Sequence, residues 1–172
     1  MLDTHFSTRP VSIRTAVNFS ELKISKNPHE TLVAFRIGSG IAVSMYDSTV
    51  RVGGLLNFIL PDSSVVAPER ASRFPYMFAD TGLMVLLEAL IDGGATTDSI
   101  QVVIAGGAHI LDQTFDFNIG LKNQGAVTSF LHRSHLSVHY EDVGGCARRM
   151  LSLDIGSGCN FIQTAGRGEI KI

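Results

Sequence analysis

Apolar residues occur in short runs along the chain, and turn-forming residues separate these runs. Three such runs span residues 31–37, which are rich in β-branched and aromatic side chains, 41–46 and 52–60, and each is followed by Gly, Asp or Pro. Runs of this length and composition, bounded by such residues, are typical of strands. We therefore predict three successive strands at hairpin spacing.

Two segments carry their apolar residues at helical spacing. Asp80 and Thr81 offer a helix N-cap, and the apolar positions after them cover more than half of a helix circumference before Gly93 and Gly94. A second helix is predicted from residue 123 to about residue 133, with a single apolar stripe. The first helix should be largely buried, and the second should pack on one face only.

The remaining segments are strand-rich. Further strands are predicted over residues 100–105, 136–143, 148–154 and 159–164, whereas residues 63–75, which contain two prolines, predict an exposed loop. Residues 1–11 show no periodicity and predict a flexible arm before a single domain over residues 12–172. Several strands follow one another without an intervening helix. This order favours an α+β layered sandwich of mainly antiparallel or mixed sheets packed against two main helices.

Composition narrows the class of protein. The 172 residues are 45% hydrophobic and 17% charged, and the formal net charge is −2, so the chain can bury a core but lacks the basic surface that nucleic acid requires. The first residues do not resemble a signal peptide, and Glu88 interrupts the longest apolar stretch, residues 83–91. We expect a cytoplasmic protein that does not insert into membranes and whose two cysteines stay reduced.

Ligand-binding motifs are weak. The glycine pairs at residues 38–40, 53–54, 106–107 and 144–145 lack the context of a P-loop or a dinucleotide site, so tight turns with positive φ are the favoured interpretation. His132, His135 and His139 have spacing that metal sites use, but His132 is predicted at a helix end and His139 in the next strand. We therefore predict neither a metal nor a cofactor.

The two cysteines are candidate nucleophiles only if a base lies nearby. Cys146 follows a glycine turn and Cys159 begins a predicted strand, and no histidine stands at a spacing that forces contact with either. Most unpaired cysteines are small core residues, and that is the favoured interpretation here. The fallback catalytic set is Cys146 or Cys159 as nucleophile with His109, which follows a glycine turn, as base.

A collinear series of segments resembles the chemoreceptor glutamine deamidase family CheD over roughly residues 18–164. The segments are 24–28 (ISKNP), 37–43 (IGSGIAV), 46–47 (YD), 52–57 (VGGLLN), 60–63 (LPDS), 79–81 (ADT), 105–108 (AGGA), 118–120 (NIG) with Asn123, and 142–145 (DVGG). The order of these segments is more specific than any one motif. The resemblance implies a layered α/β sandwich and a cysteine hydrolase that converts receptor glutamines to glutamates.

The residues that the family uses for this chemistry are absent. The resemblance places the nucleophilic cysteine at Gly40, the histidine base at Asn57 and the orienting threonine at Ala34, and it places Arg36 where the family has glycine. Glycine offers no nucleophile, and asparagine cannot relay a proton near neutral pH. Catalysis through these positions is therefore not expected. Arg36, Gly38, Ser39, Gly53 and Gly54 are predicted to remain as a vestige of the substrate site.

The resemblance also implies partners. The leading hypothesis is a pseudoenzyme that binds chemoreceptor cytoplasmic helices, a CheC-like phosphatase, or both, as a monomer or a weak heterodimer, because binding surfaces involve many more residues than the chemistry does. An active deamidase with a relocated cysteine and histidine is the alternative. A structural role for residues 1–11 and 63–75, or drift without function, also stays open.

Overall fold

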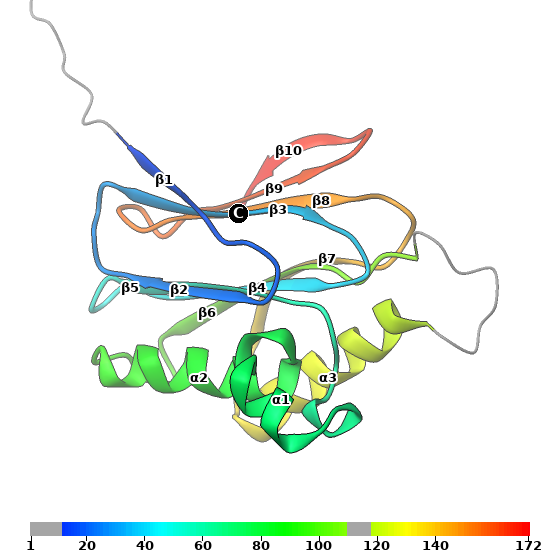
Figure 1. The fold of residues 1–172 in the computed structure, drawn as a ribbon. Coiled ribbons are helices and arrows are strands. Elements are labelled where there is room, and N and C mark those ends of the chain that lie inside the picture. The colour runs from blue at the N-terminus through cyan, green and yellow to red at the C-terminus, as the bar shows by residue number, and fades with distance from the viewer. Residues whose placement is uncertain (1–11, 110–117) are drawn as a thin grey trace, which may run out of the picture.

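The computed structural model describes residues 12–109 and 118–172, and the predicted arm over residues 1–11 lies outside this part of the chain. The chain forms two stacked five-stranded sheets with helices against one of them (Figure 1). The outer sheet has the order β1 (Ile13–Ala16), β3 (Glu30–Ile37), β8 (Arg149–Asp154), β9 (Asn160–Thr164) and β10 (Gly168–Lys171). The inner sheet has the order β2 (Glu21–Ser25), β5 (Val52–Phe58), β4 (Ile41–Asp47), β6 (Ile100–Gly106) and β7 (Val138–Val143).

The helices all lie on the far face of the inner sheet. They are η1 (Ser63–Val65), α1 (Pro68–Arg73), η2 (Pro75–Met77), α2 (Ala79–Asp92) and α3 (Ile119–Arg133). The outer sheet therefore has one face against the inner sheet and one face that no described helix covers (Figure 1). Most strand pairs are antiparallel, and β1 with β3 and β6 with β7 are parallel. The predicted α+β layered sandwich is confirmed.

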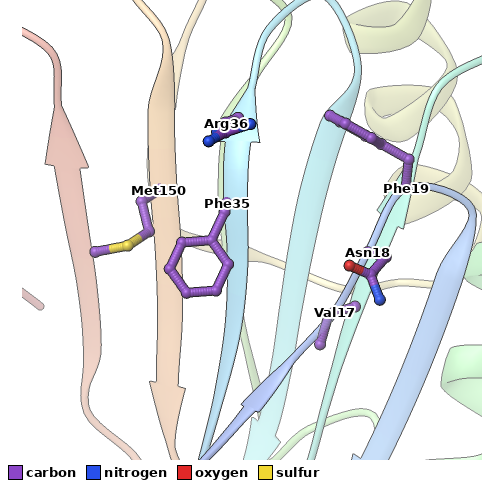
Figure 2. Close-up of a pocket in the computed structure, with 6 residues that line it drawn as sticks. All are labelled: Val17, Asn18, Phe19, Phe35, Arg36 and Met150. Atoms are coloured by element: carbon purple, nitrogen blue, oxygen red, sulfur yellow. The ribbon is translucent and has the colours of Figure 1, made fainter.

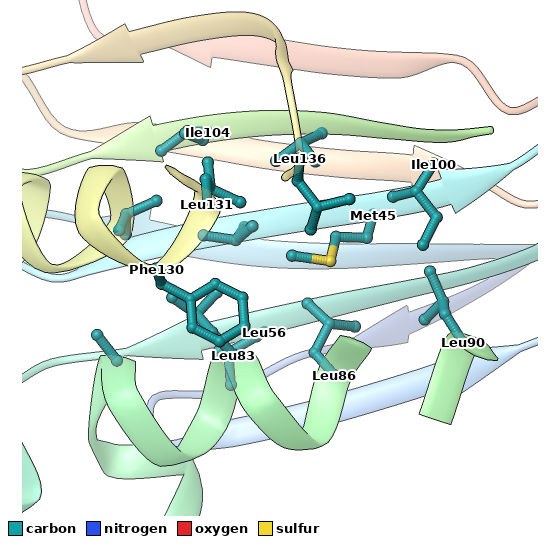
Figure 3. Packing of buried hydrophobic residues seen from close by; sticks show 14 of the residues in the cluster. Met45, Leu56, Leu83, Leu86, Leu90, Ile100, Ile104, Phe130, Leu131 and Leu136 are labelled. Carbon is teal, nitrogen blue, oxygen red and sulfur yellow. The ribbon is translucent and has the colours of Figure 1, made fainter. Parts of the chain in front are cut away.

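Side-chain alternation along the inner sheet builds two cores. In β4, Ile41, Val43 and Met45 face the helices, whereas Ala42 and Tyr46 face the outer sheet. Leu83, Leu86 and Leu90 of α2 pack with Met45 and with side chains of α3 on the helix side (Figure 3). Every residue of β4 and β5 is buried, and most of their side chains are accordingly apolar.

The predicted hairpin between the first two strands is wrong. β3 and β4 lie in different sheets, and residues 38–40 carry the chain from the outer sheet to the inner one. Of these three predicted strands, only β4 and β5 pair with each other, as antiparallel neighbours. The apolar pattern cannot distinguish a hairpin turn from a crossing between sheets, because both need a short turn between two apolar runs.

The predicted loop over residues 63–75 is also wrong, since it contains η1 and α1. Pro68 occupies the start of α1, where its missing N–H leaves no helix bond unmade, and Glu69 stands in the first turn. Prolines here begin helices instead of marking a loop. Similarly, Asp80 is not the N-cap of α2: Phe78 takes that position, and the Asp80 carboxylate accepts hydrogen bonds from Ser63.

Other boundaries differ for local reasons. α3 begins at Ile119, four residues before the predicted start, because the Asn118 side chain accepts a hydrogen bond from the Leu121 N–H. Gly53 and Gly54 are strand residues and not a turn, since a Cβ on either one would collide with packed side chains. The sequence analysis did not predict the short strands β1, β2 and β10. No helix in the described residues is long and apolar enough to cross a membrane.

A buried carboxylate fixes the end of β4 that lies away from residues 38–40. Asp47 is fully buried and accepts hydrogen bonds from Thr49, Val50, Thr96 and Ser99. Burial alone would raise its pKa, but hydrogen bonds from Ser99, Thr49 and Thr96 outweigh burial and lower the pKa from 3.8 to about 2. These bonds connect the β4–β5 turn to the segment before β6.

We expect Asp47→Asn to lower the free energy of unfolding by about 2 kcal/mol at pH 7. A carboxylate with a depressed pKa stabilises the fold above its ordinary pKa and stops doing so as pH falls from about 4 to about 2. The difference between the variant and the parent should therefore shrink across that window, which urea unfolding at several pH values would measure. Asp98→Asn, at an exposed carboxylate, is the control. A pH-independent difference would contradict the assignment.

Candidate functional site

Residues 38–40, the crossing between the sheets, are held from three sides. The Ala108 N–H donates to the Gly38 carbonyl at 2.9 Å, and the Gly107 N–H donates to the Gly40 carbonyl at 2.8 Å. The Asn123 amide of α3 donates to the Ser39 carbonyl at 2.9 Å and to the Ile59 carbonyl at 3.1 Å. The crossing, the glycine turn after β6 and α3 therefore form one rigid cluster at this end of the molecule.

Gly40, at the predicted nucleophile position, has no room for a side chain. It is buried, and a Cβ placed on it would lie 2.6 Å from the Phe58 carbonyl oxygen and 3.5 Å from Ile59. The Phe58 oxygen belongs to the backbone of β5 and cannot rotate away. The chain thus leaves no space at the position where the resemblance places the nucleophilic cysteine.

We expect Gly40→Cys to lower the free energy of unfolding by about 1–3 kcal/mol, because the new Cβ must displace the β5 backbone. Gly125→Cys is a matched control, since a Cβ at Gly125 would meet nothing within 4 Å. Denaturant unfolding of both variants with the thiol kept reduced would measure the difference. Equal stabilities for the two variants would show that the space at Gly40 is larger than this geometry gives.

The other two triad positions are buried in the same layer, between the sheets. Ala34 of β3 is completely buried, and Asn57 of β5 is 1% exposed. The Asn57 amide donates to the Val17 carbonyl at 3.2 Å, and the Ser20 N–H donates to the Asn57 carbonyl at 2.7 Å. Residues 17–20, which we call the covering segment, connect β1 to β2 and close this position.

The Asn57 side chain is only half satisfied. Its Oδ1 is buried without a hydrogen-bond partner among the described residues, although its Nδ2 is bonded. An unpaired buried acceptor lowers the stability of the fold, so asparagine is not the most stabilising residue for this position. Asparagine here can hold the covering segment, but it cannot exchange a proton with a substrate.

Arg36 does not plug the site, although it stands where the resemblance places glycine. Its side chain is exposed, and its backbone has φ of +55° at an irregularity of the β3–β8 pairing, between Ala34 and Ile37. It lines a cavity of about 520 Å³ on the outer sheet, which we call the Arg36 groove. The lining residues are Val17, Asn18, Phe19, Phe35, Arg36 and Met150 (Figure 2).

The other residues predicted to remain from the substrate site lie in two separate places. Gly38 and Ser39 lie in the crossing near Arg36, with Ser39 exposed. Gly53 and Gly54 lie at the other end of β5 from Asn57, and a Cβ at Gly53 would come within 3 Å of Leu153 and Tyr46 side chains. The structure therefore brings the crossing and Arg36 together, and it places the Gly53 pair inside the core.

Of the fallback catalytic residues, His109 lies close to the turn that carries Cys146 but not to Cys159. The His109 N–H donates to the Gly145 carbonyl at 2.7 Å, which places the turn that carries the exposed Cys146 beside His109. Cys159 lies in the β8–β9 connection, at the opposite end of the outer sheet. Neither cysteine sulfur makes a hydrogen bond to a histidine within the described ranges.

The His109 ring is already engaged. Its Nε2 lies 3.0 Å from Asn118 Nδ2, while Asn118 Oδ1 accepts from the Leu121 N–H. Because the cap fixes Asn118 with its oxygen toward the helix, its amide nitrogen is the donor and His109 Nε2 is the acceptor. The lone pair that a general base would use is thus occupied in this arrangement.

An ion pair between a buried arginine and a partly buried aspartate supports the same end of the molecule, and the sequence analysis gave it no role. Arg149 of β8, 5% exposed, donates to the Gly144 carbonyl at 2.8 Å and the Ala147 carbonyl at 3.1 Å, and its guanidinium lies 2.7 Å from Asp142. Thr164 also donates to Asp142, at 2.6 Å. Burial raises the pKa of Asp142, but the bonds from Arg149 and Thr164 outweigh it and keep the pKa below its ordinary value.

The histidines considered as metal ligands are placed as the sequence predicts. His132 ends α3 and His139 lies in β7, and both line a second cavity, of about 650 Å³, between these elements. No group of three or more His, Cys, Asp or Glu side chains with metal-binding geometry occurs within residues 12–109 and 118–172.

Comparison with known proteins gives a consistent result. The family model described as "CheD chemotactic sensory transduction" matches residues 59–164. The probable chemoreceptor glutamine deamidase CheD 1 of Syntrophus aciditrophicus is 40% identical over 150 residues, covering 87% of this chain and 93% of that protein. The corresponding proteins of Symbiobacterium thermophilum and Solibacter usitatus are 36% and 35% identical, covering 91% and 88% of this chain and 96% and 89% of their own lengths. The family-model match begins after Ala34, Gly40 and Asn57.

Proposed function

Because the chain belongs to the CheD family of chemotaxis proteins, we propose that it binds the cytoplasmic helices of chemoreceptors without hydrolysing their glutamines. The relatives are named as chemoreceptor glutamine deamidases, which supports a chemoreceptor as the partner. The observation that carries the proposal is the closed crossing: Gly40 has neither a nucleophile nor space for one, and Asn57 is covered by residues 17–20.

Binding can persist when catalysis is lost, because the two depend on different numbers of residues. The chemistry of an amide hydrolase needs a nucleophile, a base and an orienting group, whereas recognition of a helix is distributed over a surface. The proposal places the chain in the cytoplasm as a single domain over residues 12–172, acting as a monomer or a weak heterodimer. It includes a CheC-like phosphatase as a second partner.

Calorimetric titration of the full chain with receptor cytoplasmic fragments, and separately with the CheC-like protein of the same bacterium, tests the proposal. We expect saturable binding to the receptor fragment and no change in the mass of its glutamine-containing peptides after incubation. A family member that carries the cysteine, histidine and threonine serves as the positive control. No binding to either partner at high micromolar concentration would contradict the proposal.

A relocated catalytic pair remains the second candidate, because His109 and the turn that carries Cys146 are adjacent. In this mechanism, after Asn118 has released Nε2, His109 would take the Cys146 thiol proton and pass it to the departing ammonia as the sulfur attacks the glutamine amide carbon. Water would then hydrolyse the thioester to glutamate and free Cys146. Mass spectrometry of receptor peptides distinguishes the two candidates. Conversion of glutamine to glutamate that disappears in Cys146→Ala would establish the relocated pair, whereas conversion that survives in the variant would exclude it.

A further inference from the structure

The Arg36 groove combines apolar walls with one cation. Phe19 and Phe35 both line the groove and are 55% and 46% exposed, which is a large exposure for aromatic side chains. Figure 2 shows Phe35 and Met150 side by side on neighbouring strands, with Phe19 on the other side of the groove. Arg36 lies at the end of β3 that leads into the crossing, so the groove opens beside the closed catalytic position.

The Arg36 guanidinium has no ion-pair partner in the part of the chain that the structure describes. The acidic residue nearest to the groove in sequence is Glu21, and its carboxylate is already held by Asn18 and by Lys23, at 2.7 Å. Arg36 therefore offers its donors outward, next to apolar surface that lowers the local dielectric constant. A carboxylate is the group that these donors fit best, since a guanidinium binds it through two parallel hydrogen bonds.

The backbone at Arg36 is a second, independent observation. A φ of +55° is unfavourable for a residue with a Cβ and easy for glycine, which the family pattern has at this position. Strained residues cluster at functional sites, and of the four described non-glycine residues with positive φ, only Arg36 lines this groove. Because glycine would adopt this φ without strain, the arginine indicates a role for the guanidinium itself.

We propose that the Arg36 groove binds a glutamate carboxylate on a partner helix, so that the chain selects receptors whose glutamines have already been deamidated. This inference rests on the proposed function and deepens it. Glutamine and glutamate differ in one group: the amide presents an N–H₂ toward a guanidinium that can only donate, whereas the carboxylate presents two acceptors. The neighbouring side chains of the partner helix would pack on Phe19, Phe35 and Met150.

The test uses two variants of one receptor cytoplasmic fragment. In one variant every residue at a deamidation site is Gln, and in the other every such residue is Glu. Calorimetry with the full chain should give a dissociation constant at least about tenfold lower for the Glu form, as expected for a bidentate charged pair. Arg36→Gly should abolish this preference without loss of folding, because glycine accepts the positive φ. Arg36→Lys should retain only part of it, since lysine lacks the two-donor fork.

Arg51→Gly is the matched control, because Arg51 is also an exposed arginine at positive φ, +51°, but lies in the β4–β5 turn. It removes the same charge from the molecule and should leave the preference intact. Equal binding of the Gln and Glu forms, or a preference that survives Arg36→Gly, would overturn the inference and leave the proposed function standing. Binding of neither form would contradict the proposed function itself. Self-association of the chain that depends on Arg36 would assign the groove to a second copy and overturn the inference.

Discussion

Incubated with a receptor cytoplasmic fragment, the chain should deamidate glutamine at least about 10⁴-fold more slowly than a family member that carries the cysteine, histidine and threonine. The nucleophile forms the covalent intermediate and the base transfers the proton, and these groups act as a unit, so losing both leaves only what binding and oxyanion contacts supply. In this chain even those contacts are restricted, because Gly40, Ala34 and Asn57 are buried.

The measurement is the rate of conversion of receptor glutamine to glutamate, followed by mass spectrometry at matched protein concentrations. The Cys146→Ala variant is measured beside the parent to detect chemistry that originates outside the closed site. A rate within about 100-fold of the active relative would contradict the proposed function, since it would require a working nucleophile. A rate at the uncatalysed level, with saturable binding, is the expected combination.

The hydrophobic pattern predicted the layers of the fold but not the connections between them. Both faces of β4 and β5 are apolar, and this pattern marks strands that are covered on each side, as the inner sheet is. Residues 38–40, however, could have been a hairpin turn as easily as a crossing between the sheets. The choice depends on which sheet offers a partner for β3, and that partner, β8, is more than a hundred residues away in the sequence.

The sequence allows a prediction of which residues stand at the candidate site, but not of how they are arranged. Comparing Gly40 and Asn57 with the family pattern predicts the loss of nucleophile and base from the sequence alone. The sequence did not indicate where the Arg36 side chain would lie: the irregularity after Ala34 leaves it exposed, and residues 17–20 cover Asn57. A bulge depends on the register between two strands, and no local sequence signal records that register.

The covered Asn57 side chain and the exposed Arg36 groove thus lie next to each other near the end of β3 that leads into the crossing. The covering segment that closes Asn57 also supplies Phe19 to the Arg36 groove, so the same short connection covers one position and forms one wall of the groove beside it. The proposed recognition surface would then lie on the outer sheet, on the face that no described helix covers (Figure 1).

Arg149→Met should lower the free energy of unfolding by about 3 kcal/mol at neutral pH, the largest effect that we expect for a single side chain. The variant keeps the bulk of the side chain but leaves the Asp142 carboxylate without its cation and the Gly144 and Ala147 carbonyls without their donor. Groups that become unpaired in a buried position destabilise by their full desolvation penalty. Because Arg149 lowers the pKa of Asp142, the difference from the parent should be full above the ordinary pKa of an aspartate and should shrink as pH falls below it.

Arg148→Met is the matched control, since Arg148 is the adjacent residue and is exposed, and its removal should change stability by no more than about 0.5 kcal/mol. In the double variant Arg149→Met with Asp142→Asn, the uncompensated charge is gone while Thr164 keeps an acceptor, so part of the lost stability should return. Urea unfolding of the four proteins at neutral and acid pH provides the comparison. If Arg149→Met lowered the free energy of unfolding no more than Arg148→Met does, the ion pair would not stabilise the Gly144–Ala147 turn. Other contacts would then have to position Cys146 beside His109.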